Sequence, residues 1–270
     1  FTKMQGLGND FVFLNGFHYK TLPLKKIVTK LCDRRFGIGA DQLLLVSRSR
    51  QADFRMQIFN ADGSEVEMCG NGLRCLARFV HDEKLSAKKE MTVETAKGIQ
   101  TVRILGEDRI RVNMGEPVLR GREIPVKLSG RVINRPVRVE GKEFRMTCVS
   151  MGNPHAVIFV EKLKNIEIEK YGPPLENHSL FPRRANIEFV KVISRKKIEI
   201  RVWERGAGET LACGSGACAA VVASVLNGLT DRKVQVQLRG GVLQIDWNRT
   251  TGHLLMTGPA ETVFKGEIYV

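Results

Sequence analysis

Two cysteines, each beginning the same Cys-Gly-x-Gly pattern ahead of an apolar segment, constrain this chain more than any other feature. Cys69 begins Cys-Gly-Asn-Gly and Cys213 begins Cys-Gly-Ser-Gly, 144 positions further on. Helices are predicted directly after them, over residues 73–81 and 217–226. Ala and Val fill most of the second segment, which leaves it no polar face, so that helix must be buried. The fold must therefore bury at least one helix and present both cysteines at helix starts.

The spacing of 144 residues recurs at polar positions outside the cysteine loops. The matched positions are Gly8-Asn9 with Gly152-Asn153, Gln42 with Asn186, and Asn60 with Glu204. A repeat retained only for folding would chiefly keep apolar core positions. Because these retained positions are mostly polar, we interpret the chain as an old duplication in which each copy supplies half of one site.

Many short strands around one buried helix per half predict an α/β (α+β) fold of two pseudo-symmetric domains. In each domain a β-rich, mostly antiparallel sheet or barrel would wrap around the central helix, unlike the βαβ alternation of a doubly wound sheet. Gly and Pro residues between 115 and 125 indicate where the chain passes from the first domain to the second. The N-terminal domain is therefore expected over 1–116, joined by a C-terminal strand over 260–270. The second domain is expected over 117–259, with the active site in the cleft between the two.

Two further local patterns bear on the fold. Residues 23–36 have helical periodicity and are followed by Gly37, which predicts a helix that ends there. Gly6-Leu7-Gly8 lies before a predicted strand over 11–14, whereas a dinucleotide-binding fingerprint follows a strand and opens a helix. A Rossmann-type nucleotide site is therefore excluded at this position.

Composition narrows the class of protein. Apolar residues make up 43% and charged residues 27% of the 270 positions, as in soluble globular proteins, and neither a membrane span nor a signal peptide is recognised. Six cysteines in a chain of this length do not suggest a secreted disulfide framework, so reduced thiols and a cytoplasmic location are expected. The net charge of +14 is spread in pairs such as Lys88-Lys89, which favours a solvated basic surface over a nucleic-acid site.

The spacing of the cysteines also bears on a possible metal site. Zinc does not fit Cys69-x5-Cys75 or Cys213-x4-Cys218, because the spacing is wrong and no histidine completes four ligands. Neither a metal nor a cofactor is therefore expected. Four cysteines are expected to be small buried side chains rather than participants in chemistry: Cys32, Cys75, Cys148 and Cys218.

A cysteine at a helix start suggests acid–base chemistry. Unpaired N–H groups and the helix dipole favour the thiolate there and lower its pKa toward neutrality. The following glycines allow an anion to approach those N–H groups. Two such helix starts facing each other would hold one carboxylate, with a thiol on each side of its α-carbon. One cysteine as thiolate would remove the α-proton and the other as thiol would return one from the opposite side, with His155 and Glu204 tuning the thiols.

Long motifs across the whole chain resemble the diaminopimelate epimerase family. They are Gly6-Leu7-Gly8-Asn9-Asp10-Phe11, Phe59-Asn60-Ala61-Asp62-Gly63-Ser64, Met68-Cys69-Gly70-Asn71-Gly72, Met151-Gly152-Asn153-Pro154-His155 and Glu204-Arg205-Gly206-Ala207-Gly208-Glu209-Thr210, the last continuing to Ala212-Cys213-Gly214-Ser215-Gly216. The resemblance implies an isomerase that interconverts LL- and meso-2,6-diaminopimelate in lysine and peptidoglycan precursor biosynthesis. It also implies a homodimer that uses no cofactor, binds neither nucleic acid nor membrane, and has a small-molecule substrate.

The resemblance also implies roles for individual residues. Cys69 and Cys213 would be the acid–base pair, and His155 and Glu204 would adjust them. The reacting carboxylate would lie against Gly70, Asn71, Gly214 and Ser215, and the rest of the substrate against Asn9, Gln42, Asn60, Asn153, Asn186, Glu204 and Arg205.

Two positions depart from the family pattern. Leu73 replaces a small alanine and affects packing, and Phe264 replaces a tyrosine associated with dimer contact.

Two alternative functions remain open from the sequence. A proline or hydroxyproline racemase shares the two-thiol architecture. However, proline has no distal group that Arg205 and the amide side chains named above could bind. A thiol redox protein could use a Cys69–Cys213 disulfide, which requires Cα atoms within about 7 Å. Turnover of an amino acid by the reduced protein separates the enzyme from the redox protein.

Overall fold

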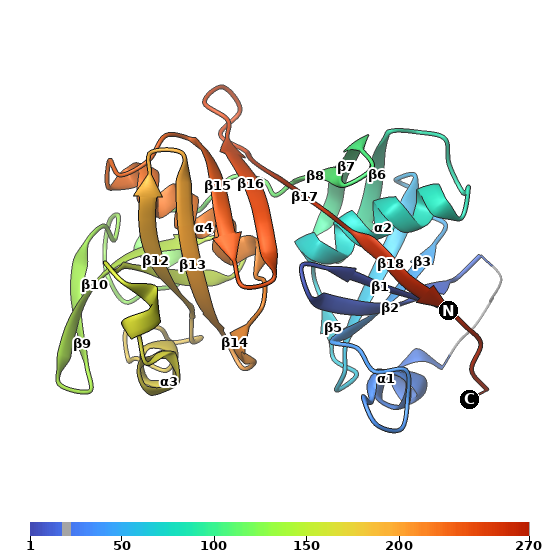
Figure 1. Cartoon of the computed structure of the whole chain (residues 1–270), viewed down its shortest axis with the longest axis horizontal. Helices are drawn as coiled ribbons and strands as arrows, with labels where there is room; N and C mark the ends of the chain where they lie inside the picture. The colour runs from blue at the N-terminus through green and yellow to red at the C-terminus, as the bar shows by residue number, and fades with distance from the viewer. Residues whose placement is uncertain (18–22, 270) are drawn as a thin grey trace. The chain divides into compact units, whose positions relative to one another are not determined.

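The computed structural model describes residues 1–17 and 23–269. The chain divides into two compact units, which we call unit 1 (Phe1–Asn113 with Thr257–Val270) and unit 2 (Met114–Met256). Within the described residues, no helix is long and apolar enough to cross a membrane. Figure 1 shows the same ingredients in each unit, a curved sheet and a helix against its concave side.

Unit 1 is a sheet curled around helix α2 (Gly70–Asp82). The strands pair in the order β18–β1–β2–β3–β4–β6–β7–β8, with β5 on β4; of these pairs, β2/β3 and β4/β6 run parallel and the others antiparallel. Helix α2 contacts β1 and β18 near one end of this row and β7 and β8 at the other, so the sheet wraps around it. The bounds are β1 (Thr2–Gly6), β2 (Asn9–Asn15), β3 (Gln42–Ser47), β4 (Phe54–Asn60), β5 (Glu65–Val66), β6 (Glu90–Thr95), β7 (Gly98–Gly106), β8 (Arg109–Asn113) and β18 (Glu261–Lys265).

Unit 2 repeats this arrangement around helix α4 (Gly214–Leu226). Its strands pair in the order β9–β10–β11–β12–β13–β15–β16, with β14 on β13; of these pairs, β11/β12 and β13/β15 run parallel and the others antiparallel. Helix α4 contacts β10, β11, β12, β13, β15 and β16. The bounds are β9 (Arg135–Val139), β10 (Lys142–Ser150), β11 (Pro154–Phe159), β12 (Asn186–Ser194), β13 (Lys197–Glu204), β14 (Gly208–Thr210), β15 (Lys233–Leu238) and β16 (Gly241–Trp247), with 3-10 turns η1 (Gly121–Glu123) and η2 (Leu163–Asn165). Strand β17 (Leu254–Gly258) begins in the unit 2 range and ends in the second segment of unit 1.

The duplication extends to the pairing of individual residues. Phe11 pairs with Gln42 in unit 1, and His155 pairs with Asn186 in unit 2, each shifted by 144. The next strand pair keeps the same register, with Leu44 opposite Ile58 and Glu188 opposite Val202. The predicted α/β fold of two pseudo-symmetric halves is therefore confirmed.

Both central helices begin three residues earlier than their apolar pattern predicts. Cys69 and Cys213 are extended residues that cap the helices, and the glycines after them are already helical. Glycine has a poor intrinsic helix propensity, so periodicity alone starts these helices too late. Helix α4 is buried as predicted, with Ala217 and Val222 both fully enclosed.

Two outer helices differ from the predictions. Helix α1 (Leu24–Cys32) ends before Phe36, because extended Asp33 accepts hydrogen bonds from the N–H groups of Arg35 and Phe36 through its own carboxylate. Helix α3 (Ile168–Glu176) has no sequence prediction, since it contains Pro173 and Pro174, which usually interrupt a helix.

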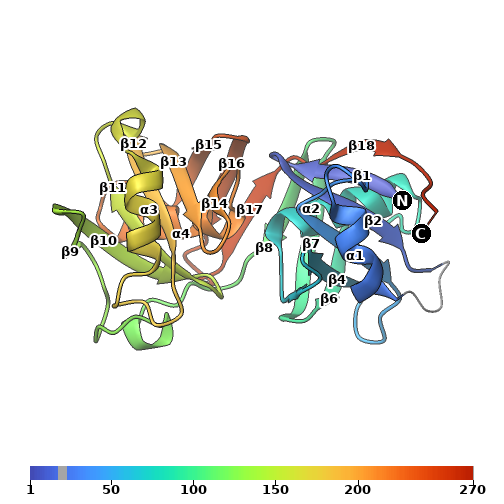
Figure 2. The ribbon, with the colours of Figure 1, turned by 90° about the horizontal axis from the view of Figure 1, so that it is seen from below.

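Tertiary packing stabilises α3 despite its prolines. It contacts β9, β12, β13 and β14 (Figure 2). Tyr171 and Leu175 from α3 join Phe144 and Phe189 of the sheet in one buried cluster, and the Phe144 and Tyr171 rings pack edge to face at 5.1 Å. Strand β12 is consequently covered by α3 on one side and by α4 on the other.

Candidate functional site

The Cys69 thiol lies at the first turn of α2. Cys69 has φ −135° and ψ 113°, and its Sγ accepts a hydrogen bond from the backbone N–H of Gly72 at 3.4 Å. A Cβ at Gly72 would lie 2.8 Å from Leu44 Cδ2, so the sheet approaches this turn too closely for a side chain. The glycine thus lets the helix start settle directly on β3.

Two predicted amides surround this thiol. Asn9 Oδ1 is 3.8 Å from Cys69 Sγ and also accepts a hydrogen bond from Asn71 Nδ2 at 3.2 Å. The fully buried Arg74 donates to Asn71 Oδ1 at 2.9 Å and to the carbonyl of Pro259 at 3.0 Å. Cys69, Asn9 and Asn71 are therefore brought together as predicted, with Gly70 as the first helical residue beside them.

The other two predicted residues of unit 1 form a pair of their own. Gln42 and Asn60 are opposite one another on β3 and β4, and Gln42 Nε2 donates to Asn60 Oδ1 at 2.9 Å. Asn60 Nδ2 donates in turn to Ser64 Oγ at 3.0 Å. These bonds fix both amides at the strand ends.

An ionic network that the sequence did not predict holds Asn9 in place. Asn9 Nδ2 donates to Asp41 Oδ2 at 2.9 Å, and Arg34 bridges Asp41 and Asp10 with bonds of 2.8 and 2.7 Å. Lys3 also pairs with Asp10 at 2.6 Å. The signal in the sequence is adjacency, because the two aspartates stand directly beside the matched residues Asn9 and Gln42.

This network makes the stability of the protein sensitive to acid. Burial raises the pKa of Asp10, but bonds from Arg34 and Lys3 outweigh it and lower the pKa from 3.8 to about 2. A carboxyl with a depressed folded-state pKa stabilises the protein above pH about 4 and loses that contribution as the pH falls toward 2. Asp10→Asn should cost about 2 kcal/mol in urea unfolding at pH 7 and less at pH 3. Exposed Asp108→Asn is the control, and an equal cost at both pH values would contradict the prediction.

The Cys213 thiol occupies the equivalent position in unit 2. It precedes Gly214 at the start of α4, with φ −121° and ψ 109°, and is 5% exposed. Its Sγ lies 3.5 Å from Ser215 Oγ, and Ser215 Oγ accepts a hydrogen bond from Asn153 Nδ2 at 3.4 Å. A Cβ at Gly216 would lie 2.7 Å from Glu188 Oε1 and 3.3 Å from Cys213 Sγ, so glycine leaves room for both side chains.

Carboxylates surround Cys213 and change the expected ionisation. Burial raises the pKa of the Cys213 thiol well above its usual value, and the charges of Glu204 and Glu188 raise it further. Burial also raises the pKa of Glu204, which hydrogen-bonds to Cys213 and accepts from Thr210 Oγ1 at 2.6 Å. The sequence-based expectation of a lowered pKa is therefore wrong for Cys213, because desolvation and two carboxylates outweigh the helix start.

His155 connects the Cys213 region to a residue that sequence reasoning missed. His155 Nδ1 lies 2.7 Å from Glu188 Oε1, and both side chains are fully buried. His155 Nε2 lies 3.0 Å from Asn153 Oδ1, on the amide that reaches Ser215. A glutamate inside the apolar β12 run Ile187 to Val190 was the available signal for Glu188.

Asn186 and Arg205 form the last part of the predicted set. Asn186 Nδ2 donates to the carbonyl of Pro154 at 3.1 Å, and Asn186 Oδ1 accepts from the backbone N–H of Arg205 at 2.9 Å. The side chain of Arg205 is exposed and donates to the carbonyl of Arg183 at 3.1 Å. The loop that carries Arg205 is thereby tied to the strand next to His155.

Each unit thus combines a thiol, a helix start and neutral amides, which suits proton transfer beside a bound carboxylate. All six cysteines are free, and no three His, Cys, Asp or Glu side chains within the described ranges are grouped to hold a metal ion.

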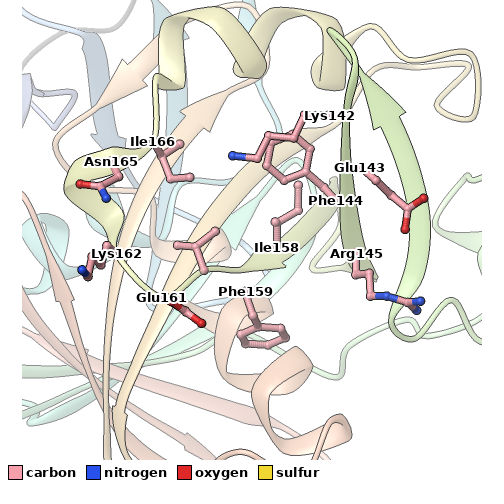
Figure 3. Close-up of a pocket in the computed structure, with 11 residues that line it drawn as sticks. Lys142, Glu143, Phe144, Arg145, Ile158, Phe159, Glu161, Lys162, Asn165 and Ile166 are labelled. Carbon is pink, nitrogen blue, oxygen red and sulfur yellow. The ribbon is translucent and has the colours of Figure 1, made fainter.

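A pocket of about 520 Å³ lies elsewhere on unit 2, between β10, β11 and η2 (Figure 3). Lys142, Arg145 and Lys162 are among its lining residues, whereas none of the predicted site residues lines it.

Solved structures share this fold at low sequence identity. A putative phenazine biosynthesis PhzC/PhzF protein from Clostridium difficile superposes with a TM-score of 0.71 and 14% identity, covering 100% of this chain and 98% of that one. A probable proline racemase from Agrobacterium radiobacter superposes with a TM-score of 0.70 and 12% identity, covering 100% and 92%. These likenesses concern the fold alone.

Sequence relatives are much more similar. Proteins named diaminopimelate epimerase from Acetivibrio thermocellus and Agathobacter rectalis are 50% and 51% identical, each covering 99% of this chain and 98% of their own length. One from Methanococcus maripaludis is 48% identical, with 99% of both chains covered. The family model described as diaminopimelate epimerase matches residues 1–120 and 147–263. With thiols, helix starts and amides present in both halves, this chain belongs to the diaminopimelate epimerase family.

Proposed function

We propose that this protein interconverts LL- and meso-2,6-diaminopimelate by proton transfer at one α-carbon, using Cys69 and Cys213 and no cofactor. The observation that carries the proposal is the duplicated half-site, in which each cysteine is the residue directly before an equivalent helix, with a matched asparagine in the same cluster of side chains. Relatives that bear the name of this activity are about half identical over nearly the whole chain. The proposal requires both units to contribute to one substrate site.

The reaction follows from the two helix starts. One thiolate removes the α-proton, and the electron pair left behind is delocalised into the α-carboxylate. Backbone N–H groups at Gly70, Asn71, Gly214 and Ser215, in the first turns of the two helices, would stabilise that charge. The other thiol delivers its proton to the opposite face, so one proton is taken, one is given, and the stereocentre is inverted.

The remaining amides and Arg205 would bind the distal end of the substrate. That end carries an ammonium and a carboxylate, for which amide oxygens and a guanidinium are suitable partners. The side chain of Arg205 is exposed on a loop tied down by Asn186. Proline has no such distal group, which argues against the proline racemase alternative.

Proton exchange at the α-carbon tests the proposed function. Reduced protein would be incubated in heavy water with LL-diaminopimelate, and with L-proline in a parallel sample. We expect deuterium at the α-carbon of newly formed meso product and none in proline. Exchange in proline alone would identify a proline racemase instead, and exchange in neither would leave the thiol redox function.

A homodimer and a cytoplasmic location belong to the same proposal. Val263 and Phe264 on β18 are 55% and 48% exposed, which supports burial of this strand against a second copy. Sedimentation velocity would measure the oligomeric state. The free thiols support a reducing compartment.

A further inference from the structure

Glu188 and Leu44 occupy equivalent positions beneath the two central helices. Glu188 lies on β12, which pairs with β11 directly after Asn153, and Leu44 lies on β3, which pairs with β2 beginning at Asn9. Their cross-strand partners Val202 and Ile58 are also 144 residues apart. A Cβ on the glycine three residues after the thiol would meet Leu44 Cδ2 at 2.8 Å in unit 1 and Glu188 Oε1 at 2.7 Å in unit 2. The same space holds a methyl group in one unit and a carboxylate in the other.

The fold itself does not require an acid at this position. Unit 1 is built with Leu44 there and with Phe11 where unit 2 has His155, and all four side chains are fully buried. Taking a carboxylate out of water costs several kcal/mol unless its partners compensate. Glu188 Oε2 has no hydrogen-bond partner among residues 1–17 and 23–269, so its compensation is incomplete. A role in the chemistry of the site therefore explains the presence of Glu188 better than a role in packing does.

A continuous series of contacts leads from this acid to the thiol. Glu188 Oε1 is 2.7 Å from His155 Nδ1, and His155 Nε2 is 3.0 Å from Asn153 Oδ1. Asn153 Nδ2 donates to Ser215 Oγ at 3.4 Å, and Ser215 Oγ is 3.5 Å from Cys213 Sγ. The carboxylate accepts from Nδ1–H, which fixes the ring of His155 with Nε2 directed at the Asn153 amide.

We propose that Glu188 is a positioning residue for proton transfer at Cys213: through His155, Asn153 and Ser215 it orients the thiol, and its negative charge keeps that thiol protonated until substrate binds. This inference rests on the proposed two-thiol function. Cys213 would then be the acid when substrate first presents its proton to Cys69.

Unit 1 orients its corresponding amides by other means. Asn9 is held by Asp41 at 2.9 Å, and Asn71 by the guanidinium of Arg74 at 2.9 Å. Cys218 occupies the position in α4 that corresponds to Arg74, so the buried cation is specific to the Cys69 half. A buried guanidinium bonds Asn71 in one half-site and a buried carboxylate lies beside the thiol turn in the other, which distinguishes two otherwise similar half-sites.

The charged groups that face Cys213 come from three strands. Glu188 lies on β12, Glu204 on β13 and His155 on β11, while α4 itself contributes the hydroxyl of Ser215. Neutralising Glu188 removes one of two carboxylates that disfavour the thiolate. The ionisation of Cys213 should therefore shift to lower pH when Glu188 is made neutral, while Glu204 remains in place.

The test uses Glu188→Gln, which keeps the shape and removes the charge. Alkylation of Cys213 by iodoacetamide would be followed against pH, with the modified peptide quantified by mass spectrometry. We expect the midpoint to fall by about one pH unit or more and kcat for diaminopimelate to fall roughly tenfold to a hundredfold, with KM changed less than about threefold. Glu176→Gln is the matched control, because Glu176 is another buried acid of unit 2 that bonds Trp203 and Arg184 instead.

A second variant separates this role from folding. His155→Phe with Glu188→Leu installs the unit 1 pair in unit 2 and should fold with an unchanged or higher urea midpoint, since replacing buried ionic pairs by apolar residues is often neutral or stabilising. Its kcat should fall at least as far as that of Glu188→Gln. An unchanged alkylation midpoint and an unchanged kcat in Glu188→Gln would overturn the inference. Absence of wild-type turnover would instead refute the proposed function, and the alkylation midpoint would still decide the role of Glu188.

Discussion

Removing either thiol should abolish epimerisation while leaving proton exchange with one diastereomer. In Cys213→Ala, the Cys69 thiolate can still remove the α-proton that faces it and return a deuteron to the same face. In Cys69→Ala, Cys213 can do this only with the opposite configuration. Each variant should therefore lose interconversion by at least about 10³-fold, because general acid–base groups typically contribute 10² to 10⁴ and both are needed for inversion.

The stereochemistry of the residual exchange makes this a sharp test. Proton magnetic resonance in heavy water would follow exchange of LL- and meso-diaminopimelate separately in the two variants. The expected pattern is complementary, with each variant exchanging one diastereomer. Cys75→Ala and Cys218→Ala are matched controls, because these thiols are fully buried on the same two helices. Equal exchange of both diastereomers by one single-thiol variant would contradict the assignment of one thiol to each face.

Replacing Arg205 should weaken use of the substrate without disturbing the thiols. A guanidinium that binds a carboxylate through two charge-assisted bonds is worth about 2–3 kcal/mol, so Arg205→Met should lower kcat/KM roughly thirtyfold to a hundredfold. Arg205→Lys keeps the charge but not the fork and should lose less, about tenfold. The pH dependence of Cys213 alkylation should stay that of wild type in both variants.

A neighbouring arginine provides the control for Arg205. Arg184 is an exposed residue of the same surface that pairs with Glu176 at 3.1 Å, and Arg184→Met should change kcat/KM less than about twofold. The comparison is made by steady-state kinetics with LL-diaminopimelate. If Arg184→Met were as damaging as Arg205→Met, general loss of surface positive charge would explain both results. If Arg205→Met were fully active, another residue would have to bind the distal carboxylate.

Several features were determined by the sequence alone. The spacing of 144 predicted the duplication, which the matched strand registers of Phe11 and His155 confirm. The apolar run after Cys213 predicted a buried helix, because a segment without a polar face has no stable exposed position. Family motifs predicted the two thiols and their amides as the site. The duplication and the buried helix could be predicted because residue spacing and residue type carry them directly.

The buried residues that support the thiols could be identified only from the tertiary structure. In the sequence, Glu188 is a single acid within an apolar strand. Its proposed role depends on the contact with His155, 33 positions earlier, which only the folded chain shows. The raised pKa of Cys213 likewise depends on burial and on carboxylates from two other strands. Helix α3 forms across two prolines because its apolar side chains pack against the sheet. Desolvation and long-range contacts are properties of the folded chain, and no local pattern encodes them.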